Sequence, residues 1–232
     1  MAFIQCDFFS DVLGLSMSMN VILPQKMTRQ IGIEGQQVTG KAPCLWLLHG
    51  YSDDHSTWSR RTSIERYVAD RGIAVVMPAA HKSYYTNIPQ GYQYWEYISE
   101  ELPQIARSLF PLSEARQDNF VAGLSMGGFG AFKLALNHPD RYAAAASLSG
   151  AVHRDWLFKS DHNLSSRLFG SEASFNESIN DLSHLVTELN HSTQEKPRLF
   201  QCCGSKDFLI EDNRKFRDLV VRPKSFFTKT EI

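Results

Sequence analysis

A serine stands in a glycine-flanked turn between two apolar segments. The turn, Gly123-Leu-Ser-Met-Gly127, follows the apolar run 120–124 and precedes a second apolar run at 129–136. The first run predicts a buried strand and the second a helix, so Ser125 is expected at the apex of a sharp strand-to-helix turn. Glycines on both sides leave room for that turn, and the hydroxyl is then held out above a helix N-terminus. The pattern indicates a nucleophile; the alternative is a Gly-rich turn with an ordinary exposed serine.

A serine hydroxyl needs a base to take its proton and N–H donors to stabilise the oxyanion that forms. Candidate donors follow the apolar run 43–48, where Gly50 lets the backbone turn so that the Tyr51 N–H can face a pocket. The Met126 N–H, next to the serine, is the second candidate donor. We expect His49 to brace this loop rather than to act as the base. A plain turn at a strand end is the alternative interpretation.

A carboxylate is available at the end of another apolar run. Asp207 closes the segment 203–207, and in folds that hold a serine on such a turn this loop carries the acid that orients a catalytic histidine. Glu211 and Asp212 are close by but start the next expected helix, where the helix dipole explains an acidic residue. Asp207 is therefore the candidate acid, with a plain turn aspartate as the alternative.

The other expected elements of secondary structure alternate between strands and helices. We expect strands at 4–12, 15–23, 43–48, 73–77, 120–124, 143–148 and 198–203, and helices at 62–70, 94–110, 129–136 and 211–221. The first two strands are expected to form an antiparallel pair at a sheet edge, and Pro103 to kink or divide its helix. Such alternation predicts one α/β domain over 1–232, with a mostly parallel sheet and helices on both faces. The polar segment 151–196 is interpreted as an irregular insertion with short helical patches.

Composition excludes several classes of function. The 232 residues carry a formal net charge of -1, which leaves no electrostatic footprint for nucleic acid or a charged membrane. No segment has the length of a membrane span or the pattern of a secretory signal. The four cysteines form no C-x-x-C, which favours buried thiols in a reducing compartment over disulfides or a metal site. We expect a cytoplasmic protein with no metal and no cofactor.

Four blocks in order resemble the esterase D family of α/β-hydrolases, and within it most closely the bacterial tributyrin esterase group. They are residues 1–24 with their paired strands, Leu-Leu-His-Gly-Tyr-Ser-Asp-Asp-His-Ser-Thr-Trp at 47–58, residues 123–131, and Gln-Cys-Cys-Gly-Ser-Lys-Asp-Phe-Leu-Ile-Glu-Asp-Asn at 201–213. The resemblance implies the α/β-hydrolase fold and the hydrolysis of short-chain acyl esters through an acyl-enzyme on Ser125. It implies Asp207 as the triad acid, a small-molecule acyl ester as partner, and no cofactor.

The chain departs from the resembling family after Asp207. There the family places its catalytic histidine, following the last strand in a Gly-x-His-x-Trp-like segment before a final helix. All eight histidines of this chain precede Asp207: His49, His55, His81, His138, His153, His162, His184 and His191. We therefore find no catalytic histidine, with His153 as a remote substitute, and expect the last strand and helix to be lacking. The alternative for the strand is that residues 225–232, which are rich in β-branched and aromatic side chains, pair as a makeshift last strand.

Three interpretations of function follow. The first is a short-chain serine carboxylesterase of impaired activity. The second is a non-catalytic member that binds acyl compounds, and the third is a thioester hydrolase of the S-formylglutathione type. An uncovered strand edge and an apolar face without its helix would also favour self-association into a homo-oligomer.

Overall fold

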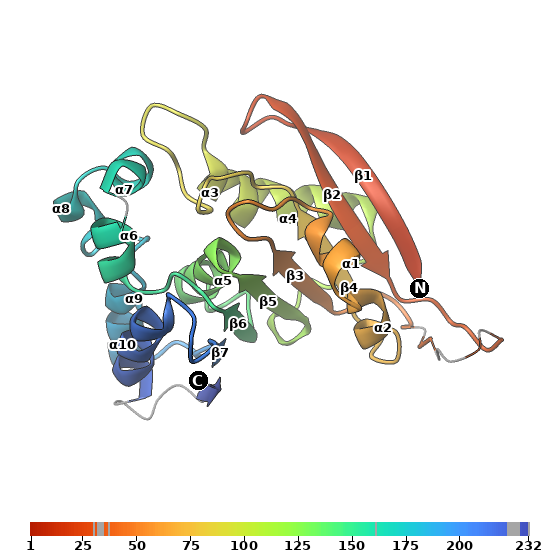
Figure 1. The fold of residues 1–232 in the computed structure, drawn as a ribbon. Helices are drawn as coiled ribbons and strands as arrows, with labels where there is room; N and C mark the ends of the chain where they lie inside the picture. The colour runs from red at the N-terminus through yellow and green to blue at the C-terminus, as the bar shows by residue number, and fades with distance from the viewer. Residues whose placement is uncertain (30, 32–34, 37, 161, 222–227, 232) are drawn as a thin grey trace.

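The fold was described from a computed structural model. It covers residues 1–232 except 30, 32–34, 37, 161, 222–227 and 232. Within that part of the chain, eight strands form one sheet in the order β1-β2-β4-β3-β5-β6-β7-β8 (Figure 1). The strands are β1 (Ala2–Ser10), β2 (Leu15–Leu23), β3 (Cys44–Leu48), β4 (Ala74–Pro78), β5 (Asn119–Leu124), β6 (Ala144–Leu148), β7 (Arg198–Cys202) and β8 (Thr228–Glu231).

The first two strands form the expected antiparallel pair at the sheet edge. Ala2 pairs with Leu23 and Ser10 with Leu15, and β2 then pairs antiparallel with β4. Gly14 makes the turn with φ +67°, a region that glycine adopts without steric cost. The expected first strand, 4–12, was placed two residues too late.

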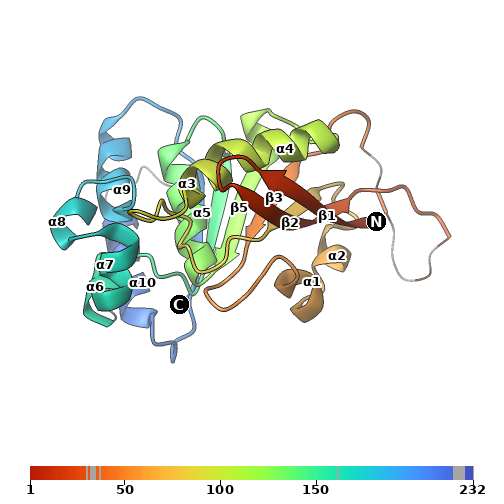
Figure 2. The same cartoon turned by 90° about the horizontal axis from the view of Figure 1, so that it is seen from above.

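From β4 through β3, β5, β6 and β7 to β8 every neighbouring pair is parallel. Helices α1 (Thr57–Arg61) and α2 (Ile64–Val68) lie on one side of this sheet. Helices α4 (Leu102–Leu109), α5 (Met126–Asn137), α9 (Leu182–His191) and α10 (Ile210–Val221) belong to the larger core on the other side (Figure 2). The mostly parallel sheet with helices on both faces is thus confirmed. Helix α1 was not predicted from the sequence.

The helix expected at 94–110 is divided, and Pro103 gives the reason. Helix α3 (Tyr94–Glu96) runs into a π-helical turn at Tyr97–Glu101 before α4 begins. Proline has no N–H to donate to the carbonyl four residues earlier, which is that of Ser99. The Arg141 guanidinium donates to that Ser99 oxygen at 2.9 Å instead, so the divided helix leaves this buried acceptor satisfied.

The segment 151–196 holds more regular structure than expected. Helices α6 (Arg154–Ser160), α7 (His162–Phe169) and α8 (Glu172–Phe175) precede α9. The ring of Phe169 lies 6.0 Å from that of Phe129 on α5, and the ring of Phe175 lies 5.2 Å from that of Phe169. The insertion therefore contributes aromatic side chains to the main core.

The expectation that the last strand is lacking was wrong, and the alternative of a makeshift last strand near the C-terminal end is confirmed. Residues Thr228–Glu231 form β8 and pair parallel with β7, from Leu199 opposite Thr228 to Cys202 opposite Glu231. The β-branched threonines of this short segment suit a strand, and β8 supplies the backbone partners that β7 would otherwise lack. Among the described residues no helix is both long and apolar enough to cross a bilayer.

Candidate active site

Ser125 lies at the junction between β5 and α5, as expected. Its backbone has φ +55° and ψ −115°, while β5 ends at Leu124 and α5 begins at Met126. A non-glycine residue in that region is strained, and such strain is common at functional sites. The Ser125 N–H donates to the Leu148 carbonyl at 2.9 Å, which ties the turn to the end of β6. Ser125 itself is half-buried.

The two flanking glycines are required because backbone fills the space where a side chain would lie. A Cβ on Gly123 would stand 2.2 Å from the Gly127 oxygen. A Cβ on Gly127 would stand 2.3 Å from the carbonyl oxygen of Leu48, at the end of β3. Both contacts are with backbone, which cannot rotate away as a flexible side chain can. The steric argument made from the sequence is confirmed at both positions.

The loop after β3 is braced by His49. This side chain is 1% exposed; its Nδ1 lies 2.7 Å from the Gly50 oxygen, and its Nε2 accepts the Ala80 N–H at 2.9 Å. An accepting Nε2 and a carbonyl at Nδ1 define a neutral ring protonated at Nδ1. Burial also lowers the pKa of His49, which favours that neutral form. His49 is thus structural, as expected.

Further hydrogen bonds hold the same loop. The Trp58 indole N–H donates to the Leu48 oxygen at 3.0 Å, and the Tyr85 hydroxyl donates to the His49 oxygen at 2.8 Å. These bonds fix the backbone that leads to Tyr51. The ring of Tyr51 lies 5.7 Å from that of Tyr84, whose N–H points to the sulfur of Met126 at 3.3 Å. Both proposed oxyanion donors therefore belong to residues in contact with Tyr84.

Lys133 lies in the apolar run 129–136 and received no role from the sequence. It holds the loop that contains Tyr84 and Tyr85 against α5. It is fully buried, and its Nζ donates to the Tyr85 oxygen at 2.9 Å and lies 4.2 Å from the centre of the Trp95 ring. Burial lowers the pKa of Lys133. Tyr84 and Tyr85 both have positive φ, near +50°, so the loop needs such an anchor.

Asp207 follows β7, in the loop where the sequence placed it. Its Oδ1 accepts the Leu209 N–H at 2.9 Å, and the residue is half-buried. The carboxylate thus caps the turn that leads into α10. Its role as triad acid stays a prediction.

His153 is turned toward acidic neighbours. Its Nδ1 receives the Asp155 N–H at 3.3 Å and lies 3.8 Å from a carboxylate oxygen of Asp212 and 3.9 Å from one of Asp155. His153 as a substitute base stays a prediction.

From the sequence, the dipole of the following helix explained why an acidic residue stands at position 212. The structure shows a second role for Asp212. Its carboxylate is buried and accepts the His153 N–H at 2.8 Å and the Trp156 N–H at 3.3 Å, so it connects α10 to the start of α6. Burial raises its pKa to about 7. The sequence offered no signal for this contact, because the two partners lie more than 50 residues apart.

The sequence matches the protein family described as "Putative esterase" over residues 10–226. The chain belongs to this esterase family. It is 29% identical over 229 residues to an acetyl esterase of Caldicellulosiruptor saccharolyticus, with 92% of this chain and 84% of that protein covered. The family description and this relative both name ester hydrolysis, which identifies the chain as a member of an enzyme family.

Two solved structures from Staphylococcus aureus agree with the fold. One is the fluorophosphonate-binding serine hydrolase F with bound substrate, at a TM-score of 0.86 and 32% identity. The other is an S-formylglutathione hydrolase apoenzyme, at a TM-score of 0.84 and 32% identity. Each match covers 99% of this chain and 90% of the other chain. The α/β-hydrolase fold of this esterase is thereby confirmed.

The contact at Gly127 gives a first expected outcome. Gly127→Ala should destabilise the protein by about 1–3 kcal/mol or more, because the new methyl group would meet a fixed carbonyl. Urea unfolding followed by circular dichroism measures this. Gly204→Ala is the matched control, since its Cβ would lie 3.9 Å from the nearest atom and its φ is not positive. Equal stability of the two variants would contradict the steric account.

Asp212 predicts a pH dependence of stability. Its pKa is about 7 in the fold and near 3.8 when unfolded, so between these values the folded protein holds a proton that the unfolded chain releases. Stability should therefore fall as pH rises from 4 to 7, by on the order of 4 kcal/mol from this group. The charged groups around it are Asp155, His153 and Lys215.

The measurement compares thermal unfolding of the wild type and Asp212→Asn across pH 4–8. Asparagine cannot titrate, so the fall in the melting temperature between pH 4 and 7 should be smaller in the variant. Parallel profiles of the two proteins would show that Asp212 does not carry this dependence.

Proposed function

We propose that this esterase hydrolyses short-chain acyl esters of the acetyl or butyryl type through an acyl-enzyme on Ser125. The observation that carries the proposal is the strained position of Ser125, at φ +55° between β5 and the N-terminus of α5. The relative named as an acetyl esterase supports a short acyl group. The tributyrin type of substrate rests on the resemblance of the sequence blocks.

In the proposed reaction the Ser125 oxygen attacks the ester carbonyl. The carbonyl oxygen becomes an oxyanion, and the Tyr51 and Met126 N–H groups would stabilise it. The alcohol leaves with a proton, and water then releases the acid from the acyl-serine. Met126 is the first residue of α5, so the positive end of the helix dipole adds to the stabilisation.

The base of the proposed triad is assigned to no residue of this chain. The family resemblance places the histidine after the last strand, whereas the eight histidines of these 232 residues all precede Asp207. Asp207 is the proposed acid that would orient such a histidine. We propose that this chain alone turns over slowly, by the residual catalysis of roughly 10³–10⁴ over water that an oxyanion hole and binding provide. If turnover falls to zero, the chain binds acyl compounds without hydrolysing them, which is the non-catalytic interpretation.

A thioester hydrolase of the S-formylglutathione type is the second candidate. One of the similar structures bears that name, and acyl transfer to serine is the same chemistry for both leaving groups. In this chain the Lys82 ammonium lies 5.0 Å from the centre of the Tyr51 ring, beside the proposed oxyanion donor. A cation there suits the carboxylates of a glutathione leaving group.

We propose the cytoplasm as the place of action. All four cysteines, Cys6, Cys44, Cys202 and Cys203, are free thiols, which fits a reducing compartment.

Hydrolysis of p-nitrophenyl acetate and butyrate tests the proposal. We expect slow release of p-nitrophenol that His153→Ala leaves unchanged, with His191→Ala as the exposed control. Ser125→Ala should lower the rate only to the part that the oxyanion hole and binding provide without a nucleophile. Added imidazole should raise the rate of the wild type by supplying the missing base, and should add nothing to Ser125→Ala beyond its reaction in solution. Fast turnover that His153→Ala removes would contradict this account of the base.

The substrate class is tested under the same imidazole-supplemented conditions. If the leaving group is anionic, Lys82→Ala should raise KM for a glutathione thioester several-fold and leave KM for p-nitrophenyl acetate unchanged. An equal change for both substrates would favour the simple ester.

A further inference from the structure

Strand β1 forms one edge of the sheet. In the part of the chain that the structure describes, no strand pairs with its outer side (Figure 1). β1 is nine residues long, Ala2–Ser10, whereas β8 at the opposite edge has four. Every second residue of an edge strand points its N–H and C=O groups away from the sheet. β1 therefore presents a long row of backbone groups that another strand could bind.

Edge strands usually carry a feature that prevents pairing with another chain, such as a proline, a lysine, a β-bulge or an inward-pointing charge. β1 has the sequence Ala-Phe-Ile-Gln-Cys-Asp-Phe-Phe-Ser, with neither proline nor lysine. Its register with β2 runs without a bulge over all nine residues. Its one charged residue, Asp7, is exposed and accepts a hydrogen bond from the Ser18 hydroxyl. The edge is therefore open to pairing.

Large apolar side chains on both faces of β1 remain partly in water. On one face Phe3 is 42% exposed and Phe9 59% exposed. On the other face Ile4 and Phe8 pack against the main core but are only half-buried. A strand placed beside β1 would cover these four side chains, and the burial of apolar area is favourable.

The four side chains are placed symmetrically about Cys6, the middle residue of β1. A second copy of the protein can extend the sheet by antiparallel pairing of its own β1, about a two-fold axis perpendicular to the sheet. With Cys6 on that axis, all nine residues of each strand are paired. Phe3 then lies opposite Phe9 of the second copy on one face, and Ile4 lies opposite Phe8 on the other. Cross-strand pairs of aromatic and aliphatic side chains stabilise a sheet.

The polar residues of β1 fit the same register. Gln5 lies opposite Asp7 of the second copy, where the amide N–H can donate to the carboxylate. A shift of the second strand by two residues in one direction would place the two Asp7 carboxylates opposite each other, and like charges in that position are destabilising. A shift in the other direction would set Phe3 against Asp7. We propose that β1 is a dimer interface, in which two copies of this protein pair their β1 strands antiparallel with Cys6 on the two-fold axis.

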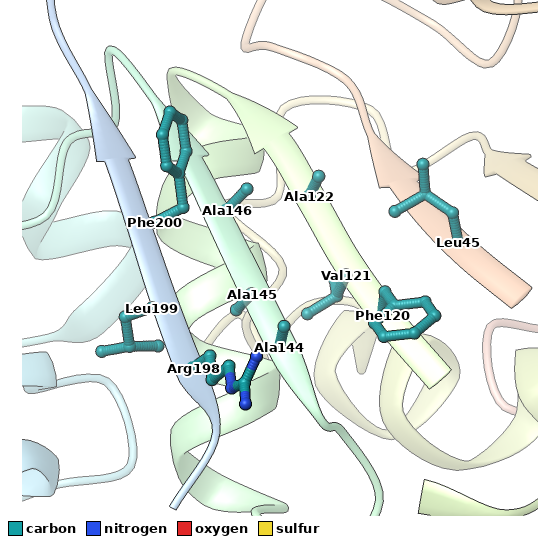
Figure 3. A pocket seen from close by; sticks show the side chains of 10 residues that line it. All are labelled: Leu45, Phe120, Val121, Ala122, Ala144, Ala145, Ala146, Arg198, Leu199 and Phe200. Carbon is teal, nitrogen blue, oxygen red and sulfur yellow. The ribbon is translucent and has the colours of Figure 1, made fainter. Parts of the chain in front are cut away.

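The middle of the sheet offers another apolar surface for a second copy. Phe120, Ala122, Ala146 and Phe200 are among the residues that line a hollow of about 250 Å³ there (Figure 3). Its lining comes from β3, β5, β6 and β7, none of which pairs with β1. Two hollows placed face to face do not fill each other, whereas the pairing of β1 is self-complementary. A dimer through the hollow is the alternative that the experiment must distinguish.

The proposed interface goes beyond the proposed function and does not depend on it. Three strands, β2, β4 and β3, separate β1 from β5, which leads to Ser125. Substitutions in β1 therefore test the dimer without touching the serine turn.

Light scattering after size-exclusion chromatography, over a series of protein concentrations, tests the dimer. We expect the wild type to be dimeric. Gln5→Asp sets a carboxylate opposite Asp7 at two symmetric positions and should raise the Kd of the dimer at least tenfold. Combining Gln5→Asp with Asp7→Gln exchanges the two side chains, removes the repulsion and should restore the dimer. Gln104→Asp, at an exposed position of α4, is the control and should dimerise as the wild type does.

Two results would overturn the proposal. One is a monomer at every concentration, or a dimer that Gln5→Asp leaves unchanged. The other is a dimer that Ala146→Leu dissociates while Gln5→Asp does not, which would place the interface in the hollow.

Cross-linking through Cys6 tests the register. Residues directly opposite each other in an antiparallel pair have Cα atoms about 4.5–5.5 Å apart, within the range of roughly 4.4–6.8 Å that a disulfide spans. Diamide takes two electrons and two protons from a pair of thiols, so it should join the two copies through their Cys6 sulfurs. Burial and the neighbouring Asp7 raise the pKa of Cys6, so the reaction is run at alkaline pH.

A non-reducing gel should show the cross-linked dimer in the wild type and in Cys202→Ser, and only the monomer in Cys6→Ser. Cys202 is the matched control because it is the other partly buried cysteine, whereas Cys44 and Cys203 are buried. A dimeric protein that diamide does not cross-link, or a cross-link that Cys6→Ser retains, would contradict the proposed interface.

Discussion

The site depends on a close backbone contact between Gly127 and the carbonyl oxygen of Leu48. Because no Cβ intervenes, the first turn of α5 can rest directly on the end of β3. The serine turn and the His49–Tyr51 loop are thereby brought together, although they lie more than 70 residues apart in the sequence. The strained φ of Ser125 is the local consequence, and the buried α5 helix and the sheet beneath it hold the residue in that conformation.

Buried polar groups fix pairs of segments that lie far apart in the sequence. His49 joins the β3 loop to the segment after β4, and Lys133 joins α5 to the loop that carries Tyr84. Asp212 joins the inserted helix α6 to α10. Each of these groups is costly to bury without partners, so each one specifies a single arrangement of two segments that hydrophobic packing alone would leave free to shift.

The sequence predicted local structure well at positions where the residue type itself constrains the backbone. The Gly-x-Ser-x-Gly turn, the β1–β2 pair and the division of a helix at Pro103 were all predicted, because glycine and proline act on the backbone locally. The roles of Lys133 and Asp212 could not be predicted, since they depend on partners distant in the chain. Strand β8 was considered only as a makeshift last strand, because a four-residue strand has little periodicity and its pairing is decided by the open edge of β7.

Mass spectrometry of the intact protein after incubation with p-nitrophenyl acetate tests most directly whether Ser125 is the nucleophile. Release of the acyl group by water also needs a base, so we expect one acetyl group to accumulate on the peptide that contains Ser125. The adduct should be absent from Ser125→Ala and from the unfolded chain. Acetylation spread over lysines, or unchanged in Ser125→Ala, would contradict the account.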